Sequence, residues 1–501
     1  MAVTEFINAS TPTVLQKICA TRQTRLEEMR VHYPEDTVFQ AAEEMTRPTR
    51  DFTAALQTDS AAFILECKKA SPSKGVICSD FDPVAIARVY QSYAAAISVL
   101  TEPDYFQGDF SYLQAVSAHV QVPVLCKDFI FSRYQVALAR YFGADAILLM
   151  LSVLDDETYR ALSIYAEQLG LHILTEVSDA DEMRRATALN AKVIGINHRN
   201  LRDLSVDLHR SEVLSALAPN EAVLIAESGI ETNEQVRQIA PFVNGFLVGG
   251  ALTAQTDIDA ACRRLLYGAH KVCGLTRPAH ALMARDAGAC FGGLIFAKRS
   301  PRCISLQQAK SICAVGGLQY VGVFALDDYH GLSATEIAGN LVRIAQELQL
   351  RAIQLHDVPD FLARQPDAAK TLALALTRAL PSICELWVAV KADEVNTIQA
   401  QLPGVNRWLL DTGKGGSGKT FNWSQIPTHG REHMMLAGGL NAENITAALR
   451  LNLAGFDVNS GVEVSPGAKC SQRVHGFFNR LRTYGRASEV QTTKAEKQPV
   501  E

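Results

Sequence analysis

Residues 122–151 read VPVLCKDFIFSRYQVALARYFGADAILLML. A short, mostly apolar run at 122–127 is followed by an amphipathic stretch of helix length, SRYQVALARYFGA, and then by a second apolar run at 144–151. Strands that are apolar on both faces are typical of a parallel sheet covered by helices. This stretch therefore predicts a strand, a helix and a second strand parallel to the first.

The same alternation runs through both halves of the chain. In the first half the apolar runs are 62–67, 95–101, 122–127, 144–151, 171–176, 191–197, 222–226 and 245–249. In the second half they are 271–274, 292–296, 320–324, 352–355, 386–390, 407–410, 434–437 and 455–458. Eight strand–helix units in about 200–250 residues are typical of the (β/α)8 barrel. We predict an α/β protein with two tandem (β/α)8 TIM barrels. The alternative, a doubly wound open sheet, requires a glycine-rich turn after its first strand, which is absent.

The domain boundary is expected between Tyr267 and Gly268. Residues 1–267 would form the first barrel with an N-terminal helical extension, because residues 10–57 are polar with a helical period and carry Leu15, Ile18 and Leu26 on one face. Residues 268–486 would form the second barrel. Residues 487–501, ASEVQTTKAEKQPVE, have little apolar mass and predict a disordered tail.

Composition narrows the classes of function. The 501 residues are 48% hydrophobic and 20% charged with a net charge of −5, so a basic nucleic-acid-binding domain is not indicated. The 11 cysteines include no C-x-x-C pair, which disfavours a disulfide framework or a zinc site and favours a reducing compartment. No signal peptide or membrane span is apparent. We expect a cytoplasmic protein with no nucleic-acid or membrane partner.

Residues 409–420, LLDTGKGGSGKT, match the Walker A phosphate-loop pattern letter for letter. A nucleotide-hydrolysing loop follows a strand and begins a helix, whose N-terminal amides hold the phosphates. The strand side fits, but Pro427 ends the next segment too soon for a normal helix. We predict that this loop binds phosphate at a barrel mouth, and nucleotide hydrolysis is the disfavoured alternative.

Polar residues gather where the strands of the first half end, which is where (β/α)8 barrels carry their chemistry. They are Glu66, Lys68, Ser71, Lys127, Glu176, Asn197, Arg199, Glu227, Ser228, Gly229, Gly249 and Gly250. Three carboxylates and two lysines at one mouth would shift one another's pKa values and can form acid–base pairs. The glycine-rich ends of the seventh and eighth strands predict a phosphate site.

The strand ends of the second half predict a similar mouth. Cys273 lies near Lys271 and Arg277, and a thiolate there can act as a base if positive charge lowers its pKa. Asp411 stands where a catalytic acid would stand, and His356 is by default a structural residue. The phosphate-cradle candidates are Gly416, Ser417, Gly418, Gly438, Gly439, Ser460 and Gly461. Both mouths are thus predicted to take small phosphorylated substrates.

Two sets of motifs, in order, carry a family resemblance over nearly the whole chain. FILECKKASPSKG, LCKDFI, LTEVS, GINHRNL and ESGI resemble indole-3-glycerol-phosphate synthase. KVCGLTR, SPR, QLH, LDTGKGGSGK, LAGGL and DVNSGVE resemble phosphoribosylanthranilate isomerase. The fused order is similar to that of the bifunctional tryptophan-biosynthesis enzymes.

In the synthase half the resemblance implies roles for the strand-end residues. Lys127 would be the general acid in ring closure, and Glu176 would be the acid–base group in dehydration. Lys68 would bind the substrate, while Glu66, Asn197 and Glu227 would orient it and the lysines. Arg199 would bind the carboxylate side. Ser71, Ser228, Gly229, Gly249 and Gly250 would line the substrate or phosphate site.

In the isomerase half the resemblance implies an Amadori rearrangement, with Cys273 as general base and Asp411 as general acid. Arg302 would hold the anthranilate carboxylate, and the cradle residues would hold the phosphate. Neither half would require a metal or cofactor, and a monomer is expected. A rival reading leaves one barrel active and the other as a scaffold. The sequence departs from the family pattern at Gly250, where Ser is common, and at Asp357, where Gly is usual. It also departs at Val388, where a Lys is often found, and at Cys470, where an acidic residue is usual.

Overall fold

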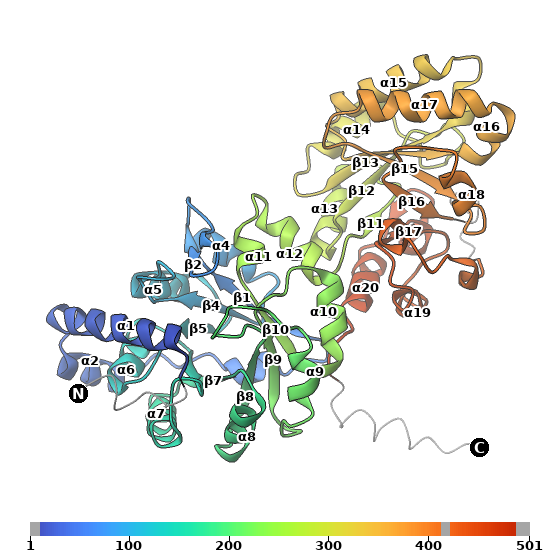
Figure 1. Ribbon diagram of the computed structural model, residues 1–501. Coiled ribbons are helices and arrows are strands. Elements are labelled where there is room, and N and C mark those ends of the chain that lie inside the picture. The colour runs from blue at the N-terminus through green and yellow to red at the C-terminus, as the bar shows by residue number, and fades with distance from the viewer. Residues whose placement is uncertain (1–10, 412–420, 487–501) are drawn as a thin grey trace, which may run out of the picture. The chain divides into compact units, whose positions relative to one another are not determined.

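The computed structural model describes residues 11–411 and 421–486, which belong to two compact units (Figure 1). The first unit runs to Cys262 and takes up the chain again from Thr483, and the second runs from Arg263 to Arg482. The division falls within helix α12 (Ile258–Leu266), a few residues before the predicted boundary. Residues 1–10, 412–420 and 487–501, including the predicted tail, lie outside the described residues.

The first unit contains a closed barrel of eight parallel strands, as predicted. The strands are β1 (Ala62–Cys67), β4 (Ala96–Leu100), β5 (Val124–Lys127), β6 (Ala146–Met150), β7 (His172–Val177), β8 (Val193–Asn197), β9 (Val223–Glu227) and β10 (Gly245–Val248). The helices and 3-10 turn of this unit, before α12, are α1 (Thr13–His32), α2 (Glu35–Glu43), α3 (Phe52–Leu56), α4 (Pro83–Tyr90), α5 (Phe110–His119), α6 (Arg133–Tyr141), α7 (Asp156–Gln168), α8 (Ala180–Ala188), α9 (Arg210–Ser215), α10 (Asn233–Ile239), η2 (Ala240–Phe242) and α11 (Gly250–Thr253). A short hairpin of β2 (Ala70–Ser71) and β3 (Gly75–Val76) follows β1.

The second unit contains another closed barrel of eight parallel strands. These are β11 (Lys271–Val272), β12 (Phe291–Ile295), β13 (Gln319–Ala325), β14 (Ala352–His356), β15 (Glu385–Val390), β16 (Arg407–Leu410), β17 (Met434–Leu436) and β18 (Gly455–Val458). The helices and 3-10 turns are α13 (Pro278–Ala287), α14 (Leu306–Cys313), η3 (Leu326–Tyr329), α15 (Ala334–Glu347), α16 (Val358–Arg364), α17 (Pro366–Ala379), α18 (Val395–Gln399), η4 (Trp423–Gln425), η5 (Arg431–His433), α19 (Ile445–Leu449), η6 (Ser460–Val462) and α20 (Ser471–Leu481). The hairpin β19 (Glu463–Ser465) and β20 (Ala468–Lys469) precedes α20.

Local sequence explains why these elements form. The apolar strands are buried almost throughout, as expected for a sheet with helices outside and side chains filling the barrel. Most helices of the first barrel begin where an Asp, Ser or Thr side chain accepts a backbone N–H of the first turn. These caps are Asp82, Asp109, Ser132, Asp155, Asp179 and Thr232.

The N-terminal extension is helical, as predicted, and its first helix lies at the C-terminal end of the first barrel. Leu15, Ile18 and Leu26 of α1 are buried. Arg22 donates two hydrogen bonds to Asp128, from Nε at 2.9 Å and from Nη2 at 2.6 Å, and both side chains are buried. Because Asp128 directly follows Lys127, α1 is fixed beside the strand end that carries a predicted catalytic residue.

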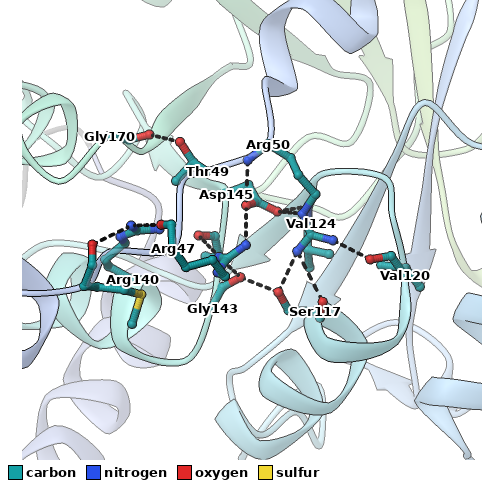
Figure 2. Close-up of polar contacts among 12 residues, drawn as sticks. Arg47, Thr49, Arg50, Ser117, Val120, Val124, Arg140, Gly143, Asp145 and Gly170 are labelled. Carbon is teal, nitrogen blue, oxygen red and sulfur yellow. Dashed lines mark hydrogen bonds and ion pairs between the residues drawn. The ribbon is translucent and has the colours of Figure 1, made fainter.

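The segment between α2 and α3 crosses the opposite end of the same barrel (Figure 2). Asp145, which directly precedes β6, accepts hydrogen bonds from Arg47 Nη1 at 3.1 Å and from the Arg50 backbone N–H at 3.0 Å. Arg50 Nη1 donates to the carbonyl of Val120 at 2.7 Å, and Thr49 Oγ1 donates to the carbonyl of Gly170 at 2.6 Å. The extension is therefore held at both ends of the barrel by different residues.

The chain also returns to the first barrel after α20. The carbonyl of Tyr484 accepts the Ala61 N–H at 2.6 Å, and the Arg486 N–H donates to the carbonyl of Val243 at 2.9 Å. The guanidinium of Arg237 lies 5.2 Å from the centre of the Tyr484 ring. Since Ala61 and Val243 precede β1 and β10, this terminal segment closes the N-terminal end of the barrel where its first and last strands meet.

Candidate active sites

A cavity of about 190 Å³ opens at the C-terminal end of the first barrel. Every residue predicted for this mouth lines the cavity except Glu227, which is buried beneath it. The predicted lining residues are Glu66, Lys68, Ser71, Lys127, Glu176, Asn197, Arg199, Ser228, Gly229, Gly249 and Gly250. The barrel thus gathers at one mouth residues that lie far apart in the sequence.

Lys127 lies at the centre of the charged groups. Its ammonium is 3.0 Å from Glu66 Oε2 and 3.5 Å from Glu227 Oε2. Lys68 forms a second ion pair with Glu66 through Oε1. The Lys127 side chain is 17% exposed and faces the cavity, whereas the Glu66 and Glu227 side chains are almost fully buried. A buried carboxylate therefore holds both lysines at the floor of the site.

The cluster shifts the pKa values of its members in opposite directions. Burial raises the pKa of Glu66, but Lys127 and Lys68 outweigh it and lower that pKa to about 2. Burial lowers the pKa of Lys127, but Glu66, Glu227 and Glu176 outweigh it and raise the pKa above its usual value. Burial is the largest cause of the raised pKa values of Glu176 and Glu227. The charge of Glu66 raises both pKa values further, and the charge of Glu176 also raises that of Glu227. The site combines a cationic lysine with carboxyl groups that retain a proton more readily than usual.

Asn197 connects Glu176 to the loop that carries Arg199. Its Nδ2 donates to Glu176 Oε1 at 3.0 Å, and its Oδ1 accepts the backbone N–H of Arg199 at 2.9 Å. The barrel register pairs Asn197 with Glu227 on the neighbouring strand. Arg199 is itself held through Nη1, which donates to the carbonyl of Leu204 at 2.8 Å. Glu176 therefore has a fixed orientation at the cavity wall.

Two glycines leave the space that the buried carboxylates occupy. A Cβ on Gly195 would lie 1.9 Å from Glu227 Oε1, and a Cβ on Gly249 would lie 2.4 Å from Glu66 Oε1. Gly195 was not among the residues predicted for this site. A lone glycine inside an apolar strand is a signal of close approach by another group, and that signal was available in the sequence.

The turn that follows β9 has an unusual backbone. Ser228 has φ of 69° and Gly229 has φ of 76°, so two consecutive residues adopt left-handed conformations. His198 fixes this turn, since its Nδ1 is 3.1 Å from the Ser228 carbonyl and its Nε2 is 2.7 Å from Ser211 Oγ. Gly249 and Gly250 stand at the start of α11, after the neighbouring strand β10, and line the same cavity.

The apolar wall of the cavity was not predicted from the sequence. Val14, Leu15 and Ile18 of α1 line it together with Phe106 and Phe129. The ring centre of Phe106 lies 5.9 Å from the Lys68 ammonium. The sequence carried no direct signal for this wall, because apolar residues on a helical extension equally predict packing against the outside of the barrel.

At the mouth of the second barrel, Cys273 follows β11 and is buried. Lys271 donates to Asp457 Oδ2 at 2.7 Å and to Gln354 Oε1 at 3.0 Å. Burial raises the pKa of the Cys273 thiol, and although Lys271 and Lys469 lower it, the net shift is upward. Burial therefore outweighs the two ammonium groups, so Lys271 and Lys469 alone do not meet the condition that positive charge lowers this pKa below its usual value.

Arg302 is buried and already has a partner. Its Nε lies 3.0 Å from both carboxylate oxygens of Glu463, and its Nη2 donates to Glu463 Oε2 at 2.6 Å. Lys469 Nζ donates to Glu463 Oε1 at 2.8 Å and to Asn459 Oδ1 at 2.8 Å. Glu463 and Lys469 were missed by the sequence analysis, although Glu463 lies in the quoted DVNSGVE motif.

Asp411 directly follows β16 and is buried among other titratable groups. Its charge acts on the pKa of both Asp457 and His356, so it shares the mouth with the Lys271–Asp457 pair. Burial lowers the pKa of His356, and His356 Nε2 is 3.0 Å from Gln354 Nε2. The acid and the thiol predicted for this barrel thus belong to one connected cluster.

The predicted phosphate cradle of the second barrel is described in part. Gly438 and Gly439 have φ of 82° and 64°, and Asn444 Nδ2 donates to the Gly439 carbonyl at 2.9 Å. Ser460 and Gly461 begin η6, where a Cβ on Gly461 would lie 1.9 Å from the Leu440 carbonyl oxygen. Gly416, Ser417, Gly418 and the rest of the Walker-like loop from 412 to 420 lie outside the described residues.

Within residues 11–411 and 421–486, no group of three or more His, Cys, Asp or Glu side chains is arranged to hold a metal ion. Over the same ranges, no helix has the length and apolar character needed to cross a membrane.

Comparison with known proteins agrees with this division of the chain. Residues 15–265 match the family of indole-3-glycerol phosphate synthase, and residues 270–480 match the family of N-(5'-phosphoribosyl)anthranilate (PRA) isomerase. The tryptophan biosynthesis protein TrpCF of Yersinia pestis is 46% identical over 474 residues, covering 95% of this chain and 95% of that protein. TrpCF of Salmonella typhi is 47% identical over 473 residues, covering 94% and 100%.

Two closed barrels, each with an acid–base cluster at its mouth, define a bifunctional barrel enzyme. The chain belongs to the indole-3-glycerol phosphate synthase family in its N-terminal barrel and to the phosphoribosylanthranilate isomerase family in its C-terminal barrel. It is therefore a bifunctional lyase and isomerase of tryptophan biosynthesis, in the predicted order, and small phosphorylated substrates fit both enzymes of that pathway.

Proposed function

We propose how the two sites carry out consecutive reactions. The second barrel would isomerise N-(5-phosphoribosyl)anthranilate to 1-(2-carboxyphenylamino)-1-deoxyribulose 5-phosphate, an aminoketose. The first barrel would decarboxylate, cyclise and dehydrate this product to indole-3-glycerol phosphate. The proposal depends on one observation. The Lys127 ammonium is held between two buried carboxylates, those of Glu66 and Glu227, at the floor of the cavity.

In the first barrel, Lys127 is the proposed general acid. Ring closure requires the aromatic carbon to attack the substrate carbonyl, whose oxygen gains negative charge and then a proton. The raised pKa of Lys127 keeps its proton in place until that charge develops. Glu66 and Glu227 position the ammonium, and Lys68, which also pairs with Glu66, binds the substrate.

Dehydration needs a group that gives a proton to the leaving hydroxyl and a group that removes one from the ring. Glu176 is proposed for this acid–base work, because its raised pKa favours the protonated form. Asn197 orients it, and Arg199 takes the substrate carboxylate. Ser71, Ser228, Gly229, Gly249 and Gly250 are proposed to line the substrate and phosphate region.

Residues 10–57 are proposed to take part in substrate binding. Val14, Leu15 and Ile18 line the cavity, and an apolar wall suits the aromatic ring of the substrate. Substitution at Leu15 is a sharper test than deletion of the extension, because the contacts of Arg47 and Arg50 at the other end of the barrel would remain. An unchanged KM of the synthase in Leu15→Ala would refute this role.

In the second barrel, Cys273 is proposed as the general base and Asp411 as the general acid of the rearrangement. Asp411 would protonate the ring oxygen as the sugar opens, and Cys273 would remove the proton from the carbon next to the resulting iminium. The thiol must first lose its proton, which burial opposes. The Lys271 ammonium and the iminium of the substrate both favour the thiolate.

Arg302 is proposed to bind the anthranilate carboxylate by sharing its guanidinium between that group and Glu463. Gly438, Gly439, Ser460 and Gly461 would hold the phosphate, together with Gly416, Ser417 and Gly418. Residues 1–267 and 268–486 are proposed as the functional domains, with 487–501 as a disordered tail. The chain is further proposed to act as a cytoplasmic monomer without a nucleic-acid or membrane partner.

The test is an end-product assay with phosphoribosylanthranilate in the absence of metal and nucleotide, with products identified by mass. Indole-3-glycerol phosphate is expected. Cys273→Ala should block consumption of the substrate, and Lys127→Ala should leave the aminoketose to accumulate. Accumulation of the aminoketose by the unmodified chain would mean that only the isomerase is active. Failure of the chain to convert either the first substrate or supplied aminoketose would refute the proposal.

A further inference from the structure

Asp357 adopts a conformation that is unfavourable for its residue type. It directly follows β14 at the mouth of the second barrel and has φ of 64° and ψ of 16°, in the left-handed region that glycine occupies with least strain. Its Oδ2 is buried and, within the described residues, has no hydrogen-bond partner. Both features cost free energy, so another interaction must compensate for the aspartate at this position.

The compensating interaction comes from the loop that follows β12, two strands away from β14 in the barrel. Arg299 Nη2 donates to Asp357 Oδ1 at 2.5 Å. The Asp357 side chain is 8% exposed and that of Arg299 is 51% exposed, so the carboxylate is fixed and the guanidinium closes over it from the solvent side. Asp357 occupies the N-cap position of α16 but makes no side-chain cap, because its carboxylate faces Arg299 instead.

Arg299 belongs to the segment 298–302 that follows β12 and ends at Arg302. The backbone N–H of Lys298 donates to Asp328 Oδ2 at 2.8 Å. At the other end of the segment, Arg302 is bound to Glu463. The Arg299–Asp357 pair lies between these two attachments and is the one that ties the segment to β14.

We propose that Asp357 is a positioning residue of the isomerase. Through Arg299 it fixes the segment that presents Arg302 to the substrate carboxylate, so that the guanidinium is in place before the substrate arrives. This inference rests on the proposed role of Arg302. Its physical basis is preorganisation, since a binding group that is already ordered loses less entropy when the ligand binds.

The test measures kcat and KM of the isomerase in the full chain, with synthase activity as an internal control in the same molecule. Asp357→Gly and Arg299→Ala are each expected to raise KM for phosphoribosylanthranilate about three- to fivefold, the range of a partly exposed ion pair, with little change in kcat. Asp357→Asn should fall between, because it keeps the shape and a neutral hydrogen bond. The double variant Arg299→Ala/Asp357→Gly should be no worse than either single variant.

Thermal stability separates positioning from a purely structural role. Asp357→Gly relieves the left-handed strain and removes the buried unpartnered oxygen, so its melting temperature should not fall although its KM rises. The matched control is Lys310→Ala, which breaks an exposed pair of the same barrel, Lys310 Nζ to Glu347 Oε1 at 2.6 Å, that involves neither Arg299 nor Asp357. Its KM should match that of the parent chain.

Several outcomes would overturn the inference. They are an unchanged KM in Asp357→Gly and Arg299→Ala, effects of the two that multiply in the double variant, or an equal rise of KM in Lys310→Ala. The variant Arg302→Ala distinguishes a failure of the proposed role of Arg302 from a failure of the positioning role of Asp357. If it leaves KM unchanged, the proposed role of Arg302 falls and this inference with it. If it raises KM while Arg299→Ala does not, only the positioning role of Asp357 is refuted.

Discussion

Gly195→Ala tests whether the space behind the synthase cavity sets the position of Glu227. The added Cβ would lie 1.9 Å from Glu227 Oε1 and 3.0 Å from its Cδ. To reach an ordinary contact distance of about 3.4 Å the carboxylate oxygen must move by about 1.5 Å. Glu227 is buried and lies 3.5 Å from the Lys127 ammonium, so this displacement changes the ion pairing of the proposed general acid.

A misplacement of about 1 Å in an active site can cost about 100-fold in rate, or about 2.7 kcal/mol of transition-state stabilisation. We expect kcat of the synthase, measured as indole-3-glycerol phosphate formed from supplied aminoketose, to fall by about that factor. The isomerase activity of the same chain should stay at the parent value, because Gly195 belongs to the first barrel.

The matched control is Gly245→Ala in the same barrel. Its Cβ would lie 2.6 Å from the Ala62 carbonyl oxygen at the opposite end of the barrel. It should lower the melting temperature and leave kcat of the synthase unchanged at a temperature where the chain is folded. Synthase activity within twofold of the parent in a folded Gly195→Ala chain would refute the reasoning, as would an equal loss of kcat in Gly245→Ala.

Three further predictions address stability, pH and the phosphate site. Arg50→Ala should lower the unfolding free energy of the first barrel by about 3 kcal/mol, because buried Asp145 loses one of its partners. KM of the synthase should stay constant in steady-state assays. A changed KM would contradict the view that Arg50 acts at the end of the barrel away from the active site. Burial lowers the pKa of His198 to about 4 from an ordinary value near 6.5, so between these pH values the folded state binds fewer protons than the unfolded state. The free energy of unfolding should therefore fall by about 2 kcal/mol from pH 7 to pH 5. Urea unfolding at both pH values checks this, and His198→Asn is expected to lose most of the pH effect. Gly250→Ser should lower KM of the synthase about threefold by adding a hydroxyl to the phosphate region, since a Cβ there meets only Ile77 at 3.4 Å; an unchanged or higher KM would place the phosphate elsewhere.

The two barrels could be predicted because each strand and each helix is encoded by its own short stretch of sequence, and this pattern repeats along the chain. Each apolar run of the quoted type fixes a strand, and each helix that follows begins at a capping residue such as Ser132. In a parallel barrel all strand ends meet at one mouth, so a polar residue after an apolar run is placed without knowledge of its partners. Lys127 and Glu176 are found in this way.

What could not be predicted depends on pairs of residues distant in the sequence. The Lys271–Asp457 ion pair joins the first and last strands of the second barrel. The sequence around either residue does not indicate which residue is its partner. The terminal segment at Tyr484 binds the first barrel through backbone groups, which carry no side-chain signal. The sign of the Cys273 pKa shift likewise depends on how completely the barrel buries the thiol, which its neighbours in sequence do not determine.

Val388 shows how a family comparison can mislead when the side-chain direction is unknown. Val388 packs with Leu386 and Val390 among residues of the helix layer, whereas Trp387 and Ala389 belong to a separate cluster inside the barrel. A side chain at position 388 therefore points away from the barrel interior, and the loss of a lysine there does not remove a charge from the mouth. The alternation of side chains along a strand decides this, and one residue of register reverses the conclusion.

Each barrel has a lysine that is paired with a buried carboxylate, and the exposure of the lysine decides its role. Lys127 is the last residue of β5, is 17% exposed and faces the cavity, so its proton can reach a substrate. Lys271 begins β11, is fully buried and lies opposite Asp457 in the register. It cannot touch a substrate at the mouth, but it lowers the pKa of Cys273 against the effect of burial. We infer that Lys271→Met would abolish isomerase activity by leaving the thiol protonated, whereas Lys127→Met would abolish synthase activity by removing the acid itself; alkaline pH should partly restore only the first.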